Sequence, residues 1–179
     1  MNESQTITLG GGCFWCTEAV YVNVRGITDV ESGYSNGQST RPSYEDVCTG
    51  RTGCNEVVQL TFDPAQITLH EILEIFFVIH DPTTLNRQGN DAGTQYRSGI
   101  YVSSPEQETV AREVIAEMTA SGVYSQPIVT EVAPLSHYWP AEDYHQDFFA
   151  RNPNQGYCMA VAAPKVAKFR KTFARLQKD

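Results

Sequence analysis

The chain is 179 residues long, a length that predicts one domain with room for a full hydrophobic core. Hydrophobic residues make up 41% of it and charged residues 19%, proportions that exclude an intrinsically disordered chain. The formal net charge is −8, the wrong sign for neutralising the phosphates of nucleic acids or anionic lipids. We therefore expect neither a nucleic acid nor a membrane as a partner.

The N-terminus and the cysteines bear on the compartment. Residues 1–9 carry no basic stretch and no apolar run, and the longest strongly apolar run, Ile75–Ile79, is far shorter than the roughly 20 residues of a membrane helix. A cytoplasmic protein is expected. Five cysteines are too few for a disulfide framework, and their odd number leaves at least one thiol free. In a cytosolic chain they favour thiol chemistry or metal binding.

Apolar periodicity, helix caps and turn residues predict strands and helices in alternation. In chain order these are a strand at 6–9, a helix from 13 to 26, strands at 27–34 and 56–62, a helix from 68 to 81, a strand at 100–102, a helix from 104 to 122, a strand at 128–132, a short helix from 140 and a basic amphipathic helix from 164 to 177. The clearest helix start is Thr68, where Glu71 completes a capping box. The pattern favours a single domain over 1–179, an α+β (α/β) sandwich in which helices pack against a mixed β-sheet.

One long segment, residues 81–97, is polar and lacks periodicity. A stretch of this length inside a compact domain is usually disordered or functional. We interpret it as functional.

Cys13 follows three glycines and opens a predicted helix. Free N–H groups and the positive end of the helix dipole stabilise a thiolate, so the pKa of Cys13 is expected to lie below its usual value. Cys16 completes the C-x-x-C spacing of a thioredoxin-like redox site. A zinc site is disfavoured, because a second C-x-x-C is missing and His137 and His145 lack the spacing of common zinc motifs.

The motif Gly11-Gly12-Cys13-Phe14-Trp15, leading into Thr17-Glu18-Ala19, strongly resembles the active-site signature of the type A peptide methionine sulfoxide reductases. Further segments that look like this family are Pro42-x-Tyr44-x-x-Val47-Cys48-x-Gly50, Glu56-Val57-Val58, Phe62-Asp63-Pro64, most of 81–98, and Asn152-Pro153-x-Gln155-Gly156-Tyr157-Cys158. The resemblance covers nearly the whole chain and implies a ferredoxin-like core. Two positions depart from the family's pattern: Cys54-Asn55 stands where His-Ala is common before the glutamate, and Cys16 where many relatives have glycine.

The resemblance implies reduction of methionine S-sulfoxide, in proteins or free, to methionine, with no metal and no organic cofactor. Cys13 would attack the sulfur as a nucleophile, and Glu56 would protonate the departing oxygen. To donate a proton at neutral pH, Glu56 must lie in an apolar pocket that raises its pKa above about 4.3.

Four further side chains are expected around the substrate. Phe14 and Trp15 would form an apolar wall for the methyl group, while the hydroxyls of Tyr44 and Tyr96 would bond the sulfoxide oxygen. Asp91, in the polar stretch, would orient the substrate or the tyrosines.

Attack by Cys13 would leave a sulfenic acid, which condenses with a second thiol to a disulfide that thioredoxin reduces. We predict Cys158 as the principal resolving thiol, because it matches the family's C-terminal Gly-Tyr-Cys and lies in a Gly-containing segment, 154–158, predicted to be mobile. Cys16 is a possible second resolving thiol. Cys48 is expected to be structural.

Two other functions fit parts of the sequence. A thiol-disulfide oxidoreductase could work with Cys13 and Cys16 alone, although the chain lacks a Trp-Cys-Gly-Pro-Cys pattern. A phosphate-binding loop at Gly10-Gly11-Gly12 is disfavoured, because the Gly-Lys-Ser/Thr of a P-loop does not follow and the glycines lack the spacing of a dinucleotide fingerprint.

Overall fold

The computed structural model of the chain describes residues 3–178. In chain order its elements are β1 (Gln5–Gly10), α1 (Phe14–Tyr21), β2 (Ile27–Ser35), α2 (Tyr44–Cys48), β3 (Asn55–Phe62), α3 (Leu69–Ile79), β4 (Arg87–Gln88), β5 (Asp91–Ala92), η1 (Thr94–Tyr96), β6 (Gly99–Val102), α4 (Pro105–Ser121), β7 (Glu131–Pro134), β8 (Trp139–Pro140), η2 (Asp143–His145), α5 (Phe148–Arg151), η3 (Cys158–Ala162), α6 (Ala163–Thr172) and η4 (Ala174–Leu176). The η elements are short 3₁₀-helices, except η3, which is a π-helix of five residues that runs into α6.

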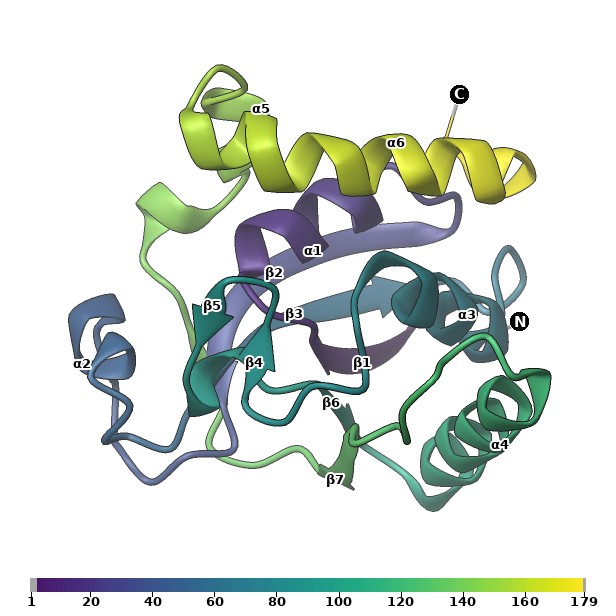
Figure 1. The fold of residues 1–179 in the computed structure, drawn as a ribbon, viewed down its shortest axis with the longest axis horizontal. Helices are drawn as coiled ribbons and strands as arrows, with labels where there is room; N and C mark the ends of the chain where they lie inside the picture. The colour runs from purple at the N-terminus through teal and green to yellow at the C-terminus, as the bar shows by residue number, and fades with distance from the viewer. Residues whose placement is uncertain (1–2, 179) are drawn as a thin grey trace.

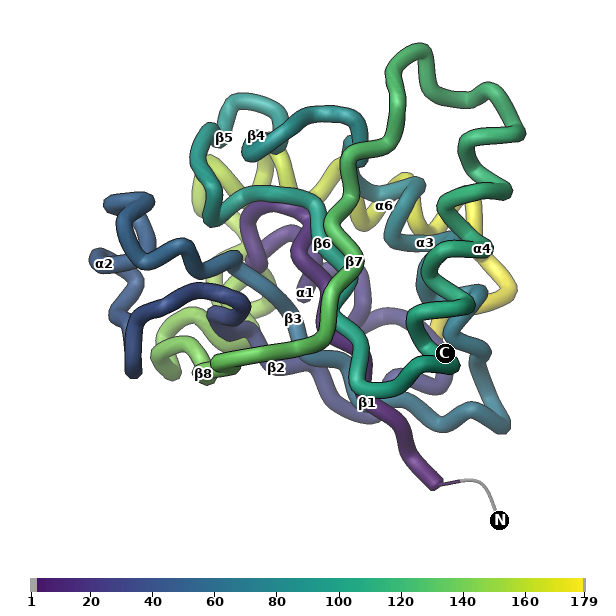
Figure 2. The backbone as a smooth tube through the Cα atoms, turned by 90° about the horizontal axis from the view of Figure 1, so that it is seen from below, coloured from purple at the N-terminus to yellow at the C-terminus, as the bar shows by residue number. Residues whose placement is uncertain are grey.

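Six strands form one mixed sheet in the order β7-β6-β1-β3-β2-β8, of which Figure 1 labels all but β8 and Figure 2 labels β8 beside β2. Within it, β1-α1-β2 and β3-α3-β6 are two interleaved split β-α-β units, and their four strands, in the order β6-β1-β3-β2, pair antiparallel. β7 joins β6 in parallel, and β8 joins β2 antiparallel. The predicted α+β sandwich with a mixed sheet and a ferredoxin-like core is confirmed.

The helices that follow β1 and β3 bury most of their surface against the sheet. Seven of the eight residues of α1 are buried, and α3 contributes its apolar face, including Ile72, Leu73 and Phe76. α6 lies across α1 in Figure 1 and behind the strands in Figure 2, and it buries Val166 and Phe169. Each such apolar side chain contributes about 1.5–3 kcal/mol on burial. Within residues 3–178, the structure has no helix with the length and apolar character needed to span a bilayer.

The predicted helix starts are confirmed more closely than the predicted helix ends. Thr68 caps α3 and forms the expected capping box with Glu71. The helix from Cys13 was predicted to end at Gly26, but it ends at Tyr21, because the Asn23 side chain donates to the carbonyl of Ala19 and closes the last turn.

Two other boundaries differ because the sheet, rather than local pattern, determines them. The strand predicted at 128–132 starts at Glu131, where pairing with Gly99 begins. The helix predicted from Pro140 is replaced by β8, an edge strand in which proline is tolerated, and helical turns begin only at Asp143. The last predicted helix is interrupted after Thr172, before η4.

The polar stretch 81–97 is folded into the β4–β5 hairpin and the η1 turn. The side-chain amide of Gln88 pairs with the backbone of Asp81 as a neighbouring strand would. It accepts a hydrogen bond from the Asp81 N–H at 2.9 Å and donates one to the Asp81 carbonyl at 2.9 Å. This polar segment therefore holds a defined shape beside the start of α1.

Candidate active site

The register of the sheet places one end of each of four strands, β1, β6, β3 and β2, on the same side of the sheet. Gly10, the last residue of β1, pairs with Gly99 at the start of β6, while Glu56, near the start of β3, pairs with Tyr34 near the end of β2. The turn that follows β1 therefore carries the start of α1 to Glu56. The backbone N–H of Phe14 donates to Oε1 of Glu56 at 3.3 Å.

Two glycines before Cys13 are required by space. A Cβ at Gly10 would lie 2.3 Å from the side-chain nitrogen of Asn55, and a Cβ at Gly12 would lie 2.6 Å from Cγ of Gln88. Gly12 also has φ +93°, a conformation that disfavours other residues. The glycine run thus packs the nucleophile turn tightly between β3 and the β4–β5 hairpin.

Glu56 is a buried acid, with 1% of its surface exposed. Burial, followed by the nearby charges of Asp91 and Cys16, raises the pKa of Glu56 to about 8. Its second oxygen, Oε2, is buried and has no hydrogen-bond partner among the described residues. Glu56 is therefore protonated at neutral pH, as a proton donor must be.

Cys13 occupies the N-cap position of α1 and is partly exposed. The prediction that the helix start lowers the pKa of Cys13 is wrong. Burial, then a hydrogen bond with Cys16 and the charge of Glu56, raises the pKa of Cys13, and the backbone N–H of Trp15 offsets only part of this. Desolvation penalises the thiolate more than the helix end stabilises it.

Cys16 and Cys158 pack together with Ala162 in a small buried cluster, and Cys13 packs against it. The thiol of Cys16 donates to the Tyr157 hydroxyl at 3.8 Å. A hydrogen bond from Cys13, together with the charge of Lys165, lowers the pKa of Cys16 although burial opposes this. The structure therefore gathers three of the five cysteines at one place.

Cys158 ends the Gly-containing segment 154–158, which the sequence predicts to be mobile. It is fully buried at the first position of the π-helix η3, and its N–H donates to Oε1 of Gln155 at 3.0 Å. Burial raises the pKa of its thiol. Cys158 packs against Cys16 of α1, whereas residues 152–156 before it are exposed, a difference that the local sequence pattern does not reveal.

Trp15 forms a partly buried aromatic wall beside Cys13. Its indole stacks on Phe148 with ring centroids 3.8 Å apart, and its N–H donates to Nδ1 of His145 at 3.0 Å. Phe14 is fully buried instead, and its ring packs on Tyr34 and His145 beneath the site. Of the two predicted wall residues, only Trp15 presents an accessible ring.

The charge of Glu56 acts on the hydroxyl groups of both Tyr44 and Tyr96. Burial and that charge raise the pKa of both hydroxyls, which remain protonated and able to donate hydrogen bonds. The backbone N–H of Tyr44 donates to Oε2 of Glu142 at 3.0 Å, and Oε1 of Glu142 accepts from the Tyr34 hydroxyl at 2.8 Å. Glu142 thus fixes the start of α2 at the site.

Asp91 lies on β5 and accepts a hydrogen bond of 2.7 Å from the Tyr157 hydroxyl. It was expected to orient the substrate or the tyrosines. The tyrosine to which its carboxylate bonds is Tyr157, next to Cys158 in the chain, rather than Tyr44 or Tyr96.

Cys54 and Asn55, which depart from the family's pattern, make no side-chain hydrogen bond with Glu56 among the described residues. Asn55 donates to the carbonyl of Arg97 at 3.0 Å and to the Tyr101 hydroxyl at 2.9 Å, on the side of β3 away from the acid. Cys54 is buried in the core. Cys48, expected to be structural, is exposed at the end of α2, and desolvation raises the pKa of its thiol.

Sequence reasoning assigned no site role to Tyr34, Glu142, His145, Phe148 or Tyr157. His145 is almost fully buried among the rings of Phe14, Trp15, Tyr44 and Tyr144. The available signal was the density of aromatic and acidic residues at 137–157, which has no helical or strand period.

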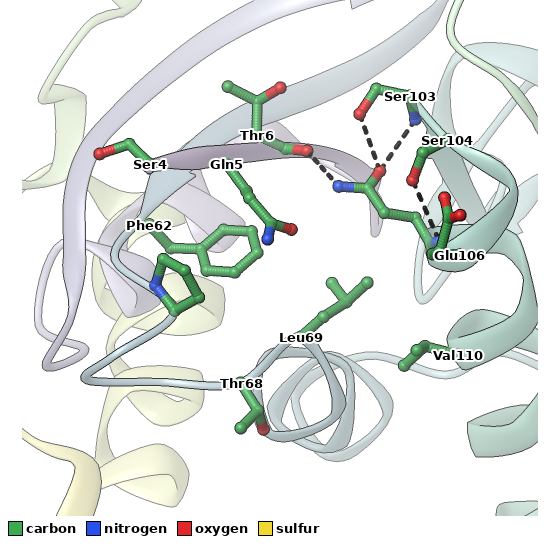
Figure 3. Close-up of a pocket in the computed structure, with 12 residues that line it drawn as sticks. Ser4, Gln5, Thr6, Phe62, Thr68, Leu69, Ser103, Ser104, Glu106 and Val110 are labelled. Atoms are coloured by element: carbon green, nitrogen blue, oxygen red, sulfur yellow. Dashed lines mark hydrogen bonds between the residues drawn. The ribbon is translucent and has the colours of Figure 1, made fainter. Parts of the chain in front are cut away.

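A separate pocket of about 640 Å³ lies between β1 and the starts of α3 and α4 (Figure 3). Its inner wall is Gln107, whose side chain donates to the Thr6 carbonyl and accepts from the Ser103 N–H. The residues found in its lining are Ser, Thr, Gln, Phe, Pro, Leu, Val and one Glu, so it offers no thiol and no carboxyl pair. The reactive groups lie at the other site, around Cys13.

Comparisons with known proteins agree with this geometry. The family model described as "Peptide methionine sulfoxide reductase" matches residues 5–177. Peptide methionine sulfoxide reductase MsrA of Polynucleobacter asymbioticus is 56% identical over 169 residues, which cover 94% of this chain and 89% of that protein.

Among solved structures, Mxr1 of Saccharomyces cerevisiae in reduced form superposes with a TM-score of 0.82 at 38% identity, covering 87% of this chain and 90% of that chain. Mxr1 in complex with Trx2 matches with a TM-score of 0.58 at 27% identity, covering 82% and 85%. The chain therefore belongs to the type A peptide methionine sulfoxide reductase family.

Proposed function

We propose that this protein reduces methionine S-sulfoxide, peptide-bound or free, to methionine, that Cys13, Glu56 and Cys158 carry the reaction, and that thioredoxin supplies the electrons. Membership of the family supports the reaction. The observation that carries the residue roles is the buried, protonated Glu56, which the Phe14 N–H holds one residue from Cys13.

In the first step, Sγ of Cys13 attacks the sulfoxide sulfur while Glu56 gives its proton to the oxygen. This attack forms a sulfur–sulfur bond. The sulfur–oxygen bond then breaks and the hydroxyl transfers to Sγ of Cys13, while the sulfur–sulfur bond breaks with its electron pair on the methionine sulfur, so methionine leaves and Cys13 becomes a sulfenic acid. The proton of the Cys13 thiol replaces the one that Glu56 donated. The net change is the transfer of one oxygen atom from sulfoxide to thiol.

The sulfoxide group is bound by Tyr44, Tyr96 and Trp15. The two hydroxyls stay protonated beside Glu56, which suits donors to a sulfoxide oxygen. The Trp15 ring, held by His145 and Phe148, offers an apolar face for the methyl group. Phe14 contributes its backbone N–H to Glu56 and its ring to the floor of the site, and Asp91 acts through Tyr157.

In the second step, the thiol of Cys158 attacks the Cys13 sulfenic acid, so a disulfide forms and water leaves. Cys158 belongs to the buried cluster with Cys16 and Ala162, and Cys13 packs against that cluster, which supports this pairing. Thioredoxin then reduces the disulfide and becomes oxidised. The relative Mxr1 has been solved in complex with Trx2, which supports thioredoxin as the reductant. Such a cycle suits the reducing cytoplasm.

Separate assays with the S and R sulfoxides of a blocked methionine, each with dithiothreitol, test the function. We expect methionine from the S epimer alone. Release of methionine from neither epimer, with disulfide exchange on a model peptide intact, would instead favour the oxidoreductase that uses Cys13 and Cys16.

A further inference from the structure

The two tyrosines that bind the sulfoxide oxygen in the proposed reaction come from separate segments. Tyr44 begins α2, which stands apart from the sheet on the left of Figures 1 and 2, in the long connection 36–54 between β2 and β3. Tyr96 ends η1, shortly before β6. Both segments lie outside the six-stranded sheet, so the spacing of the two hydroxyls depends on contacts between the connection and η1.

Arg97, the first residue after η1, supplies such contacts. Nη1 of its guanidinium donates to the carbonyl of Gly53 at 3.0 Å and to the carbonyl of Thr94 at 2.8 Å. Nη2 donates to the carbonyl of Asn36 at 3.1 Å. Asn36 and Gly53 lie at the two ends of the connection, and Thr94 is the first residue of η1. One side chain therefore joins both ends of the connection to η1.

The Arg97 side chain is largely enclosed, with 13% of its surface exposed, and its Nε lies 3.4 Å from Oε2 of Glu131 on β7. A buried cation is costly unless hydrogen bonds and an opposite charge offset the lost hydration. Three carbonyls and one carboxylate do so here. A guanidinium can serve them together because it carries five N–H groups in a fixed planar fork, which the single ammonium of a lysine lacks.

Further hydrogen bonds fix the ends of the connection and the backbone of Arg97. The N–H of Gln38 donates to the carbonyl of Thr52 at 2.8 Å, so the connection is closed just inside the two residues that the guanidinium bonds. The carbonyl of Arg97 accepts from the Asn55 side chain at 3.0 Å, and Asn55 precedes Glu56 in β3. Arg97 is therefore joined to both tyrosine-bearing segments and to the strand of the proton donor.

We propose that Arg97 is a positioning residue, which holds the Tyr44 and Tyr96 hydroxyls at the spacing that binds a sulfoxide oxygen. This rests on the proposed function, in which both hydroxyls donate to that oxygen beside Glu56. Arg97 acts through the two tyrosines, because its guanidinium bonds protein carbonyls and touches no substrate in this scheme.

Arg97→Lys is the test variant, because it keeps the positive charge and removes the fork. Arg112→Lys is the matched control, since Arg112 pairs with Glu108 on the exposed face of α4. Each of the two variants is combined with Tyr44→Phe and with Tyr96→Phe, and kcat/KM is measured with a blocked methionine S-sulfoxide and dithiothreitol. The combinations measure the coupling between Arg97 and each hydroxyl, which a general loss of stability does not produce.

In the parent, each Tyr→Phe substitution should lower kcat/KM about tenfold, since a hydrogen bond to the reacting oxygen is lost. We expect Arg97→Lys by itself to lower kcat/KM about tenfold, and each further Tyr→Phe substitution to lower it by less than about threefold, because a displaced hydroxyl contributes little to binding. In Arg112→Lys, kcat/KM and both tyrosine effects should equal those of the parent. Undiminished effects of both tyrosine substitutions in a folded Arg97→Lys protein would overturn the proposal.

The ¹³Cζ resonances of Tyr44 and Tyr96 give a readout that needs no turnover. They should move in Arg97→Lys, whereas the resonance of Tyr21, whose hydroxyl donates to the Ile72 carbonyl at 2.8 Å in the core, should not. Unmoved Tyr44 and Tyr96 resonances would refute the role of Arg97. A parent that reduces no sulfoxide would refute the proposed function and leave this measurement standing.

Glu131→Gln keeps the proposal falsifiable if Arg97→Lys does not fold. Glu131 is partly exposed on the edge strand β7, and its loss removes the charge beside Nε while the three carbonyl bonds remain. We expect the Tyr96 resonance to move and kcat/KM to fall about threefold, as for a partly exposed ion pair. An unmoved Tyr96 resonance together with an unchanged kcat/KM in this variant would overturn the proposal.

Discussion

Replacing Glu56 with Gln removes the proton donor while keeping the shape of the buried side chain. The pKa of Glu56 lies at about 8, so at pH 7 about ten molecules carry the proton for each one that has lost it. Loss of a general acid slows a step by about 10²- to 10⁴-fold. We expect Glu56→Gln to slow the first reduction step by this factor at pH 7, and less at lower pH, where solvent protonates the oxygen.

The same substitution should make the protein more stable at high pH. A carboxyl whose pKa is raised on folding favours the protonated folded state, so stability is lost as pH rises from the ordinary value of 4.5 towards the folded value of about 8. Over this range the linkage amounts to about 4 kcal/mol for Glu56, and Gln lacks it. Glu56→Gln should therefore gain stability relative to the parent as pH rises.

Single-turnover assays, in which methionine is measured after acid quenching between pH 5 and 9, isolate the first step from resolution. Urea unfolding at pH 5 and pH 8 measures the stability difference. A variant within threefold of the parent across pH 5 to 8 would show that the acid lies elsewhere. A parent and variant with the same pH dependence of unfolding would refute the raised pKa itself.

Three further outcomes are expected. Cys13→Ser should fold, shown by an unchanged circular dichroism spectrum, and release no methionine even with dithiothreitol; measurable turnover would exclude Cys13 as the nucleophile. Cys158→Ser should produce one methionine per enzyme at normal speed and then stall with thioredoxin, while dithiothreitol sustains turnover; a dominant Cys13–Cys16 bridge by peptide mass spectrometry, with thioredoxin turnover intact in this variant, would make Cys16 the resolving thiol. Because burial raises the pKa of Cys13, its alkylation by iodoacetamide in the substrate-free protein should accelerate only above pH 9, and a midpoint below pH 8 would contradict the desolvation argument.

The sequence predicts best what neighbouring residues decide together. The capping box of Thr68 and Glu71 marks the start of α3, and Ser104 with Pro105 marks the start of α4, because caps act over three residues. The apolar pattern predicts a strand from residue 128, but β7 starts three residues later, at Glu131, because pairing with β6 determines where it begins.

For the candidate site too, the sequence predicts the residues of local motifs but not the contacts between distant segments. Motif residues such as Cys13 and Glu56 could be named from the sequence, but the pKa of Cys13 depends on burial contributed by many elements. The contacts of Trp15 with His145 and Phe148 span about 130 residues of chain, and no local pattern encodes such a contact. The packing of Cys158 against α1 is likewise a tertiary property.

The glycine run before Cys13 limits how this protein can be engineered. Gly→Ala substitution is a common route to greater stability. It lowers the conformational entropy of the unfolded chain and so stabilises the folded protein by about 0.4–1 kcal/mol. At Gly10 and Gly12 that gain is out of reach, because the missing Cβ atoms leave the space that Asn55 and Gln88 fill. Gly156, close to Cys158, has open space around it and an ordinary backbone. A thermostable variant therefore has room for redesign beside Cys158 and almost none beside Cys13.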